Sequence, residues 1–505
     1  MEHAEAALAL IPRPLRCVRL PGTFAIAEGT PIYTADVSAD ALMRAVLAEL
    51  APPIEAGDSS IRLMHEPILA GQVEAYRLTI QPSGIVVEAT GTPGLLHAIQ
   101  RIRQLLLDGP ELPCCVIEDG PRFSWRGAHV DVARHMPPML WLHRFIDLIA
   151  LHGYNSLHLH LTDDQGWRMP IDRYPLLTEI GGWRARTMLR PARDGSPEVF
   201  EEERYGGSYT KAELRGLVEF AASRGVGVVP EIEMPGHATA AIAAYPELGN
   251  TGAKVEVSGS WAIHDGILNV DDGTLRFMQQ VLEEVLDVFP SPFIHIGGDE
   301  VPTTQWRESE TARARVRSEG LRDESQLYGW FLRRMAGWLR AQDRSTMVWD
   351  EALAAKLPAD STGIMAWRGE DAGRAAAGNS HPTVMAPRQF TYFDYYQSRD
   401  REREPLAIGG HLPLERVNAF EPLSPAMPVA NQRHILGTQF QLWSEYLRTT
   451  EAVEYMAFPR ACALAEVAWS PPPARDFADF RRRLAVHLKR LDRLGVNYRP
   501  LGASE

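Results

Sequence analysis

The chain has 505 residues, 45% of them hydrophobic and 23% charged, which is the composition of a globular protein with one large and one smaller domain. Its 52 Lys and Arg and 65 Asp and Glu give a net charge of −13, which argues against nucleic acid or an anionic membrane as the main partner. No stretch is apolar for long enough to span a bilayer.

The N-terminal stretch and the cysteines bear on the compartment. Residues 1–16 carry acids at Glu2 and Glu5 and only a short apolar run at 6–11, so they do not resemble a signal peptide. The four cysteines form no CxxC pair and have no His at a spacing typical of zinc; they are Cys17, Cys114, Cys115 and Cys462. We expect reduced thiols and a cytoplasmic protein, without excluding an exported form whose leader has been removed.

Residues 1–120 are predicted to form a separate, smaller α+β accessory domain. Short strands are expected at 23–27 and 31–33, followed by a helix at 40–50. Residues 76–81 and 84–89 alternate on either side of Pro82-Ser83-Gly84, which is a hairpin signal. A helix with apolar residues at helical spacing is expected at 94–107. The turn residues 118–121 mark the domain boundary.

Residues 121–475 show strands and helices in alternation, which is typical of a parallel sheet. Strands are expected at 127–132, 155–161, 225–232, 293–296, 346–349, 363–367, 383–386 and 435–443. Helices are expected at 140–151, 211–223, 275–289 and 453–468. Eight such units predict a (β/α)₈ TIM barrel as the catalytic domain. Residues 476–505 are predicted to form a C-terminal helical extension packed on the barrel.

Polar and aromatic residues gather where these strands end, and in a TIM barrel the active site lies at that face. The strand ends carry Asp131, Arg134, His135, Asp163, Asp164, Glu231, Glu233, His237, Asp299, Glu300, Trp349, Asp350, Glu351, Trp367, Tyr392, Asp394, Trp443 and Glu445. Many acids with aromatic walls, and no cationic cluster for phosphate, indicate a neutral, hydroxyl-rich ligand. A sugar fits this description.

The stretch 293–300 concentrates the chemistry. A short apolar strand is followed by two glycines and then by the adjacent carboxylates of Asp299 and Glu300. Glycosidic cleavage needs an acid that protonates the leaving oxygen and a second group that manages positive charge. The alternative is that these acids cap a helix that starts near Thr303. The glycines and the polar residues at the other strand ends favour the catalytic interpretation.

An ordered set of segments resembles glycoside hydrolase family 20, the β-N-acetylhexosaminidases, over nearly the whole chain. The segments are 126–127, 131–135, 159–165, 230–237, 295–300, 349–351 and 442–445. The N-terminal unit is similar to the accessory α+β domain of that family. One departure is Glu233, where the family usually has Asp. The resemblance implies an exo-acting, retaining hydrolysis of terminal N-acetylhexosamine in which the substrate's own 2-acetamido group attacks through an oxazolinium intermediate.

The resemblance also implies a role for each site residue. Glu300 would be the general acid and then the general base, and Asp299 would orient the acetamido group and offset its charge. Tyr392 would donate a hydrogen bond to the acetamido oxygen. Asp163 and His237 would hold Glu300 and set its proton affinity. The acetamido methyl would lie among Trp349, Trp367 and Trp443, and the sugar hydroxyls would meet Arg134, Asp394 and Glu445.

The adjacency of the two acids supports this mechanism on physical grounds. A conventional retaining pair holds its carboxyl groups about 5–5.5 Å apart on opposite sides of the bond. Such a pair is drawn more naturally from two strands than from neighbouring residues. If the substrate supplies the nucleophile, the second acid only has to orient an amide and balance its charge.

Other interpretations stay open for individual residues. The tryptophans could be core residues, Arg134 could be a plain salt bridge to Asp131, and His237 could be a helix N-terminal residue without a role. His158 and His160 share a strand face and could suggest a metal site. A pair satisfied by its neighbours is favoured, because no third ligand has matching spacing.

Other functions also remain possible. They are a disaccharide-releasing glycosidase of the lacto-N-biosidase kind, a non-catalytic sugar-binding protein and a metal-dependent barrel hydrolase. We expect no metal and no cofactor, a small oligosaccharide or glycan as partner, and a monomer or homodimer. The stretch 163–209 is expected to shape the sites beyond the scissile bond.

Overall fold

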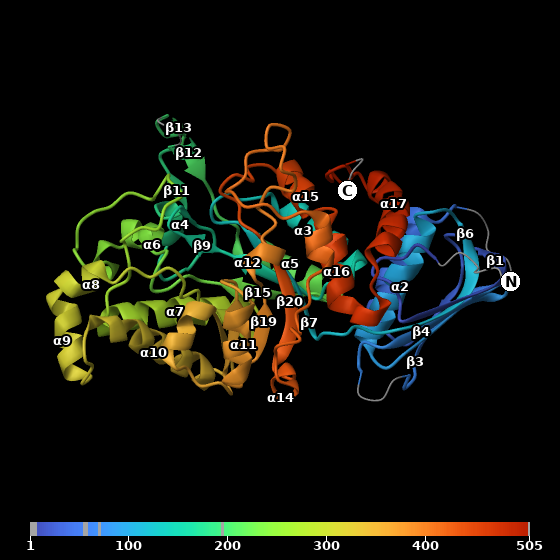
Figure 1. The fold of residues 1–505 in the computed structure, drawn as a ribbon, viewed down its shortest axis with the longest axis horizontal. Helices are drawn as coiled ribbons and strands as arrows, with labels where there is room; N and C mark the ends of the chain where they lie inside the picture. The colour runs from blue at the N-terminus through green and yellow to red at the C-terminus, as the bar shows by residue number, and fades with distance from the viewer. Residues whose placement is uncertain (1–7, 54–58, 69–71, 193–195, 503–505) are drawn as a thin grey trace.

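The computed structural model describes residues 8–53, 59–68, 72–192 and 196–502. Residues 1–7 of the N-terminal stretch, and 193–195 of the long stretch 163–209, therefore lie outside the described residues. Within them, a β-sheet unit at the N-terminal end adjoins a larger barrel (Figure 1). In the part of the chain that is described, no helix combines the length and apolar character needed to cross a membrane.

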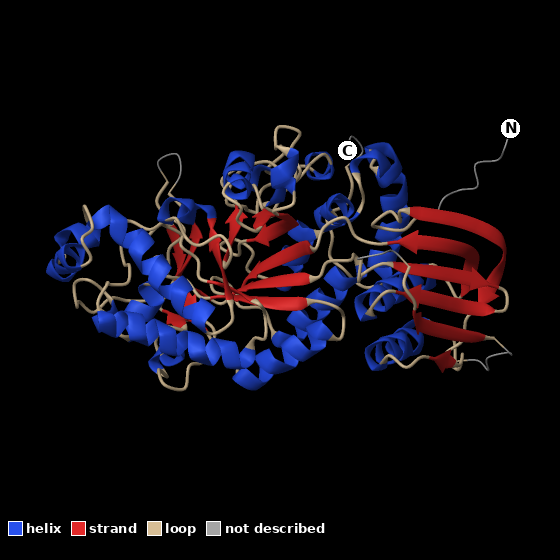
Figure 2. Cartoon of the chain, turned by 90° about the horizontal axis from the view of Figure 1, so that it is seen from below, coloured by secondary structure: helices blue, strands red, loops and turns tan. Residues whose placement is uncertain are grey.

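The N-terminal unit is a six-stranded sheet covered by two helices. The strands are β1 (Arg16–Ala25), β2 (Ile32–Tyr33), β3 (Ser60–His65), β4 (Tyr76–Gln81), β5 (Gly84–Ala89) and β6 (Glu111–Asp119), in the order β1-β6-β4-β5-β3-β2. The helices α1 (Val37–Leu50) and α2 (Thr92–Leu106) pack on the face of the sheet that is turned toward the barrel (Figure 2). The predicted α+β unit is confirmed.

Two strands of this sheet, β3 and β6, were not predicted from the sequence, and β1 is longer than the expected strand at 23–27. In β6 the adjacent residues Cys114 and Cys115 are both buried, which breaks the alternation of a half-exposed strand. The predicted turn at 118–121 is also wrong in part, because Glu118 and Asp119 are the last residues of β6. All four cysteines are free thiols.

The barrel is closed by eight parallel strands. They are β7 (Trp125–Asp131), β8 (Ser156–His160), β15 (Gly227–Glu231), β16 (Phe293–His295), β17 (Ser345–Trp349), β18 (Thr362–Ala366), β19 (Thr383–Met385) and β20 (Ile435–Leu442). β20 pairs with β7 along its length, which closes the cylinder. The predicted TIM barrel with a smaller preceding domain is confirmed, and every predicted barrel strand overlaps an observed one.

Helices on the outside of the barrel connect these strands. The longer ones are α3 (Met139–Leu151), α5 (Lys211–Ala222), α7 (Asp272–Val288), α10 (Leu327–Ala341), α11 (Glu370–Gly378), α15 (Thr450–Ala457) and α16 (Arg460–Trp469). Local signals start several of them: Thr210 and Glu213 form a capping box at α5, and Asp271 caps α7 through the backbone N–H of Thr274. The apolar stripe of α7 then packs on the barrel core.

Short elements fill the remaining connections between the strands of the barrel. The hairpins pair β9 (Thr162–Asp163) with β10 (Gly166–Trp167), β11 (Trp183–Arg184) with β14 (Tyr205–Gly206), and β12 (Thr187–Arg190) with β13 (Val199–Glu201). The other helices of the barrel domain are α4 (Leu176–Glu179), α6 (Thr239–Ala244), α8 (Thr304–Glu308), α9 (Glu310–Ser318), α12 (Arg388–Thr391), α13 (Leu414–Asn418) and α14 (Val429–Gln432). The stretch 163–209 is thus built largely of small hairpins.

The predicted single helix at 453–468 is wrong. The chain forms α15 and α16, separated at Phe458 and Pro459. Proline has no backbone N–H to donate and its ring clashes with the preceding turn, so a helix cannot run through this position undisturbed. α16 is buried along its whole length and ends in Trp469, which packs into the core of the N-terminal unit.

The C-terminal helix α17 (Phe477–Arg493) lies between the barrel and the N-terminal unit (Figure 1). Arg483 forms an ion pair with Glu466 of α16 and donates to the carbonyl of Leu10 at 2.9 Å. Arg490 pairs with Asp108 at 2.6 Å. The helix therefore joins both units, whereas the sequence predicted contact with the barrel alone.

Candidate active site

Residues 297–300 form a sharp turn at the end of β16. Gly297, Gly298 and Glu300 all have positive φ, at +66°, +95° and +48°. A Cβ atom at position 297 would lie 1.7 Å from a carboxylate oxygen of Glu233, so only glycine fits there. A non-glycine residue in this region is strained, and such strain is concentrated at functional sites.

The helix-capping alternative for Asp299 and Glu300 is wrong. α8 begins at Thr304 with Thr303, not Asp299 or Glu300, as its N-terminal cap, and the cap side chain makes no hydrogen bond to the helix. The two carboxylates instead border a cavity of about 150 Å³ at the carboxyl ends of the strands. Its lining residues are Arg134, Asp163, His237, Asp299, Glu300, Trp367, Tyr392, Asp394, Tyr395, Ile408, Trp443 and Glu445.

Trp349 is the one predicted site residue that does not line this cavity. Its side chain is 1% exposed and its indole N–H donates to Glu231 at 2.9 Å, inside the barrel. Its ring lies 5.8 Å from the ring of Trp443, which does border the cavity. In this structure Trp349 supports the cavity wall from beneath, and the expected contact with a ligand stays a prediction.

Two lining residues, Tyr395 and Ile408, were not predicted. Tyr395 lies against the ring of Tyr392, with 5.9 Å between ring centres. Ile408 is 44% exposed and comes from the long connection between β19 and α13. Tyr395 could have been predicted from the aromatic residues around position 392, but no sequence pattern indicates that a single isoleucine in a loop lines a cavity.

His237 links the interior carboxylates to the catalytic pair. Its Nδ1 lies 3.2 Å from Asp163 and 3.2 Å from Asp164, and its Nε2 lies 3.6 Å from Asp299 and 3.7 Å from Glu300. Burial alone would lower the pKa of His237, but the carboxylates of Asp163 and Asp299 raise it well above the usual range. A protonated imidazole therefore stands between the two pairs of acids.

Asp164 acts as a structural anchor. One of its oxygens accepts the backbone N–H of Thr239, at the start of α6, at 2.9 Å, and the other faces His237. These contacts fix the turn after β15, where His237 has a φ of +47°. Asp164 therefore has a structural role in this arrangement.

Arg134 is held by three side chains. Its guanidinium lies 2.9 Å from Asp163 and 3.3 Å from Asp131, and its Nε donates to Gln165 at 2.8 Å. The salt bridge to Asp131 that the sequence left open exists, and the same guanidinium also borders the cavity. Burial disfavours the charged form, yet the carboxylates of Asp163 and Asp131 keep the pKa of Arg134 well above its ordinary value.

The environment of Glu300 suits a general acid. Burial, and then the negative charge of Asp299, raise the pKa of the Glu300 carboxyl, while His237 and Arg134 act in the opposite direction. Its side chain remains 34% exposed, so the group can meet a ligand. A carboxyl group of raised pKa at a cavity edge can hold a proton at higher pH than a free glutamic acid.

Three carboxylate oxygens in the cavity wall have no hydrogen-bond partner among the described residues. They belong to Asp299, Asp394 and Glu445. Burial is the main cause that raises the pKa of Asp394 and of Glu445. Buried polar atoms are costly when unpaired, and ligand hydroxyl and amide groups would satisfy these three.

Aromatic rings form one wall of the cavity. Trp367 and Tyr392 stack with 6.0 Å between centres and 15° between planes, and Trp443 lies 6.2 Å from Tyr392. Glu351 accepts the indole N–H of Trp367 at 3.0 Å, and Asp350 accepts its backbone N–H at 2.8 Å. Asp350 and Glu351, to which the sequence assigned no role, therefore hold this wall in place.

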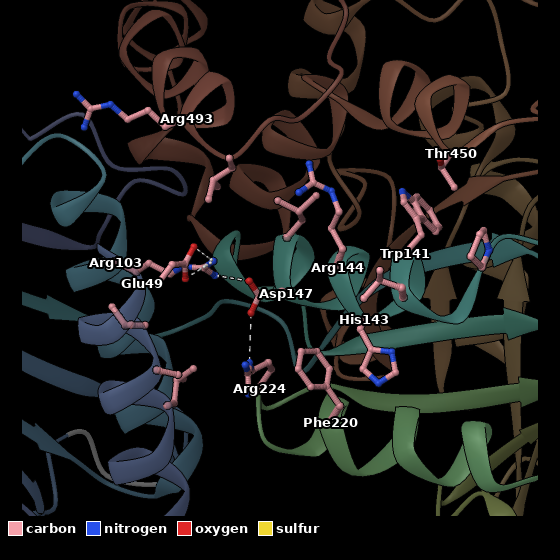
Figure 3. A pocket seen from close by; sticks show the side chains of 17 residues that line it. Glu49, Arg103, Trp141, His143, Arg144, Asp147, Phe220, Arg224, Thr450 and Arg493 are labelled. Carbon is pink, nitrogen blue, oxygen red and sulfur yellow. Dashed lines mark hydrogen bonds and ion pairs between the residues drawn. The ribbon is translucent and has the colours of Figure 1, made fainter. Parts of the chain in front are cut away.

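A larger cavity of about 680 Å³ lies elsewhere, where α1, α2, α3, α5 and α17 meet (Figure 3). It is bordered by none of the predicted site residues. Asp147 in its wall pairs with Arg103 at 2.6 Å and with Arg224 at 3.2 Å, as Figure 3 shows. The convergent polar groups that mark a catalytic site are therefore found in the smaller cavity.

Residues inside the barrel could hold a metal by type and position. Glu231 lies near His158 and His160 of the neighbouring strand and near His295. The expectation that no third ligand accompanies the His pair is therefore wrong, because Glu231 comes from β15, across the β8–β15 pair. The groups are nevertheless bonded to protein partners: Nδ1 of His158 accepts the amide of Gln439 at 3.0 Å, and Glu231 accepts the indole of Trp349.

Comparison with known proteins places this geometry in a family. Residues 123–472 match the model of the glycosyl hydrolase family 20 catalytic domain, and residues 7–120 match its domain 2. The chain is 36% identical to a β-hexosaminidase of Porphyromonas gingivalis, over 97% of this chain and 64% of that protein, so it spans less than two thirds of that relative.

Two further comparisons agree. A β-hexosaminidase of Vibrio furnissii is 36% identical, over 91% of this chain and 76% of that protein. A third match is the solved structure of a GH20 exo β-N-acetylglucosaminidase from Vibrio harveyi in complex with N-acetylglucosamine. It is 34% identical to this chain and has a TM-score of 0.85; the match covers 98% of this chain and 79% of the Vibrio harveyi chain. The resemblance drawn from the strand-end motifs is confirmed, and the chain belongs to glycosyl hydrolase family 20.

Proposed function

We propose that this protein is an exo-acting, retaining β-N-acetylhexosaminidase that removes terminal non-reducing N-acetylhexosamine from a small oligosaccharide or glycan. One observation carries the proposal: adjacent carboxylates, Asp299 and Glu300, share one small cavity with Tyr392 and an aromatic wall. Its volume of about 150 Å³ is below the ~300 Å³ at which drug-sized sites begin, which supports a single bound sugar and exo action.

In the first step Glu300 protonates the glycosidic oxygen. The acetamido oxygen of the substrate attacks the anomeric carbon, the bond to the leaving group breaks, and a cyclic oxazolinium ion forms. Asp299 accepts the amide N–H and offsets the positive charge that develops on it. The interaction strengthens as that charge grows, so it favours the transition state over the bound substrate.

In the second step the roles of Glu300 reverse. Its carboxylate, left without a proton, takes one from a water molecule that attacks the anomeric carbon. The ring of the oxazolinium opens, the acetamido group is restored, and the sugar leaves with its original anomeric configuration. Two inversions at the same carbon account for retention.

The remaining cavity residues would position the sugar. Tyr392 would donate to the acetamido oxygen, and burial raises the pKa of its hydroxyl well above the usual range, so it stays a donor. Trp367 and Trp443 would exclude water from the cyclic ion. Arg134, Asp394 and Glu445 would bind hydroxyl groups of the sugar. The carboxylate oxygens of Asp394 and Glu445 that lack a partner among the described residues support this role, because they could accept hydrogen bonds from such hydroxyls.

Hydrolysis of p-nitrophenyl glycosides tests the proposal. We expect release of p-nitrophenol from the β-N-acetylglucosaminide but not from the β-glucoside, because only the first carries the acetamido nucleophile. A chelator should leave the rate unchanged. Turnover of the β-glucoside at a similar rate, or a covalent glycosyl group trapped on a carboxylate of the protein, would contradict the mechanism.

The competing functions give different results in the same assay. A non-catalytic sugar-binding protein would bind N-acetylglucosamine without releasing p-nitrophenol. A disaccharide-releasing enzyme would cleave a p-nitrophenyl disaccharide in one step and leave the monosaccharide glycoside intact. A metal-dependent hydrolase would lose its activity to the chelator. The small cavity favours the monosaccharide-releasing enzyme among these.

A further inference from the structure

The barrel interior directly beneath the cavity holds ionisable groups in place of the usual aliphatic layer. The side chains are at most 1% exposed; they are His129, His158, His160, Glu231 and His295. Placing a carboxylate and four imidazoles in a dry interior is costly unless they are paired. The mechanism proposed above uses none of them directly.

His160 differs from the other histidines of this group because both of its ring nitrogens face carboxylates. Nδ1 bonds to Glu231, and Nε2 lies 2.8 Å from Asp163. A neutral imidazole has one donor and one acceptor nitrogen, whereas both partners here are acceptors. His160 is therefore an imidazolium that bridges two anions.

The other groups around His160 leave this assignment unchanged. Glu233 lies 4.0 Å from Nδ1, the ring of His129 lies 5.7 Å away, and His158 lies on the same strand. Burial alone would lower the pKa of His160, but Glu231 and Asp163 raise it to about 10. His158 faces Glu231 with one nitrogen only, and burial lowers its pKa to about 4, so it is neutral.

A continuous line of contacts runs from His160 to the general acid. One carboxylate oxygen of Asp163, Oδ2, lies 2.8 Å from Nε2 of His160 and 2.9 Å from the guanidinium of Arg134. Its other oxygen faces His237 at 3.2 Å, and His237 lies 3.7 Å from Glu300. The hydrogen-bond donors His160 and Arg134 thus hold the carboxylate of Asp163 so that its other oxygen faces His237.

We propose that His160, fixed by Glu231, is a positioning residue for the reaction: its positive charge holds Asp163 from inside the barrel and thereby sets the proton affinity of Glu300. The inference rests on the proposed function, in which Glu300 must carry a proton to act. Removing this cation should raise the pKa of Glu300, because a nearby positive charge favours the carboxylate. His237 is already protonated and cannot take up the missing charge.

The pH dependence of kcat/KM for the wild type, His160→Gln and His158→Gln tests the inference. His158→Gln is the matched control, since it alters a buried histidine on the same strand, next to the same Glu231, without removing a charge. We expect the alkaline limb of His160→Gln to move up by about 0.5–1 pH unit, and that of His158→Gln to stay in place. Equal shifts in both variants, or no shift in His160→Gln, would overturn the inference.

A second measurement covers the case in which His160→Gln does not fold. Nitrogen NMR of the wild type and of His237→Gln, each labelled at histidine, should show in both proteins at pH 8.5 a doubly protonated imidazole that belongs to His160. If no doubly protonated imidazole persists in His237→Gln, the assigned charge of His160 is refuted. The failure of the proposed function is a separate result, because a wild type that does not cleave the β-N-acetylglucosaminide would have no pH profile to compare.

Discussion

At the scale of single residues, the adjacent acids Asp299 and Glu300 have different surroundings, and these suit them to different roles. Glu300 is held at a positive φ, beside the negative charge of Asp299, and burial and that charge raise its pKa. Asp299 points an unpaired oxygen into the cavity and lies 3.6 Å from the protonated His237. Groups of the same type, one residue apart in the chain, are thus suited to opposite tasks.

The role of Glu300 predicts a dependence on the leaving group. Glu300→Gln cannot donate a proton, so hydrolysis of a chitooligosaccharide should fall by about 10²–10⁴-fold. Hydrolysis of the p-nitrophenyl substrate should fall much less, because p-nitrophenolate leaves without protonation. The ratio of the two kcat/KM values measures the effect. A uniform loss on both substrates would remove Glu300 from the role of general acid.

The role of Asp299 predicts a loss of rate with little loss of binding. Asp299→Asn keeps the size of the side chain but removes the charge that offsets the oxazolinium, so kcat should fall by about 10²–10³-fold. The dissociation constant of N-acetylglucosamine, measured by calorimetry, should change little, because the bound sugar carries no such charge. A variant with intact turnover would show that Asp299 is not part of the mechanism.

At the scale of elements, the turn after β16 determines where the acids lie. Gly297 combines a φ of +66° with a close approach of Glu233, which occupies the place where a side chain would be. The carboxyl group of Glu233 has no hydrogen-bond partner among the described residues. Burial and the charge of Asp299 raise its pKa well above the ordinary value, so it is a neutral acid beside the turn.

Gly297→Ala should therefore displace the turn. We expect a loss of at least about 1–3 kcal/mol in the free energy of unfolding, and a large loss of kcat, since both the φ angle and the Glu233 contact oppose a side chain. Gly337→Ala in α10 is the control: nothing lies within 4 Å of its Cβ, and helix propensity favours alanine. Urea unfolding of both variants would show the contrast, and equal stabilities would contradict it.

At the scale of the whole molecule, a few polar contacts join the two units. Asp119 of β6 is fully buried and accepts the indole N–H of Trp469 at 2.9 Å and the hydroxyl of Tyr76 at 2.8 Å. Glu74 bonds to Arg126, at the start of the barrel, and to His97 of α2 at 2.8 Å. These pairs fix the N-terminal sheet against the barrel.

Glu74 predicts a pH-dependent part of the stability. Burial alone would raise its pKa, but Arg126 and His97 lower it to about 2, against an ordinary value of 4.5. A lowered pKa means that the contribution, about 3 kcal/mol, is present above pH 4.5 and is lost as the pH falls toward 2. The free energy of unfolding of Glu74→Gln should therefore lie below that of the wild type at pH 7 and approach it near pH 2.

The control for Glu74→Gln is Glu118→Gln, which removes a partly exposed carboxylate that pairs with Arg16 and Arg77. Screened pairs at the surface contribute about 0–1 kcal/mol, so this variant should stay close to the wild type at both pH values. If the two variants lose the same free energy, the junction at Glu74 is not a main source of acid sensitivity.

The sequence by itself determined the barrel, the family and most of the cavity. Eight alternating strand and helix patterns predict one closed sheet, and because the carboxyl ends of its strands meet at one face, residues as distant as Arg134 and Glu445 could be assigned to one site. Periodicity and strand-end position are local properties, and they were enough for ten of the lining residues.

Only the tertiary structure decided what each side chain meets. The indole of Trp349 lies inside the barrel and donates to Glu231. Asp119, predicted to lie in a turn, is buried and accepts a hydrogen bond from Trp469. Ile408 lines the cavity although it belongs to a loop. The charge of His160 depends on two carboxylates that face it in space, Glu231 from β15 and Asp163 from the short strand β9 that follows β8. Burial and pairing depend on neighbours that are distant in the chain, and no local pattern of residues records them.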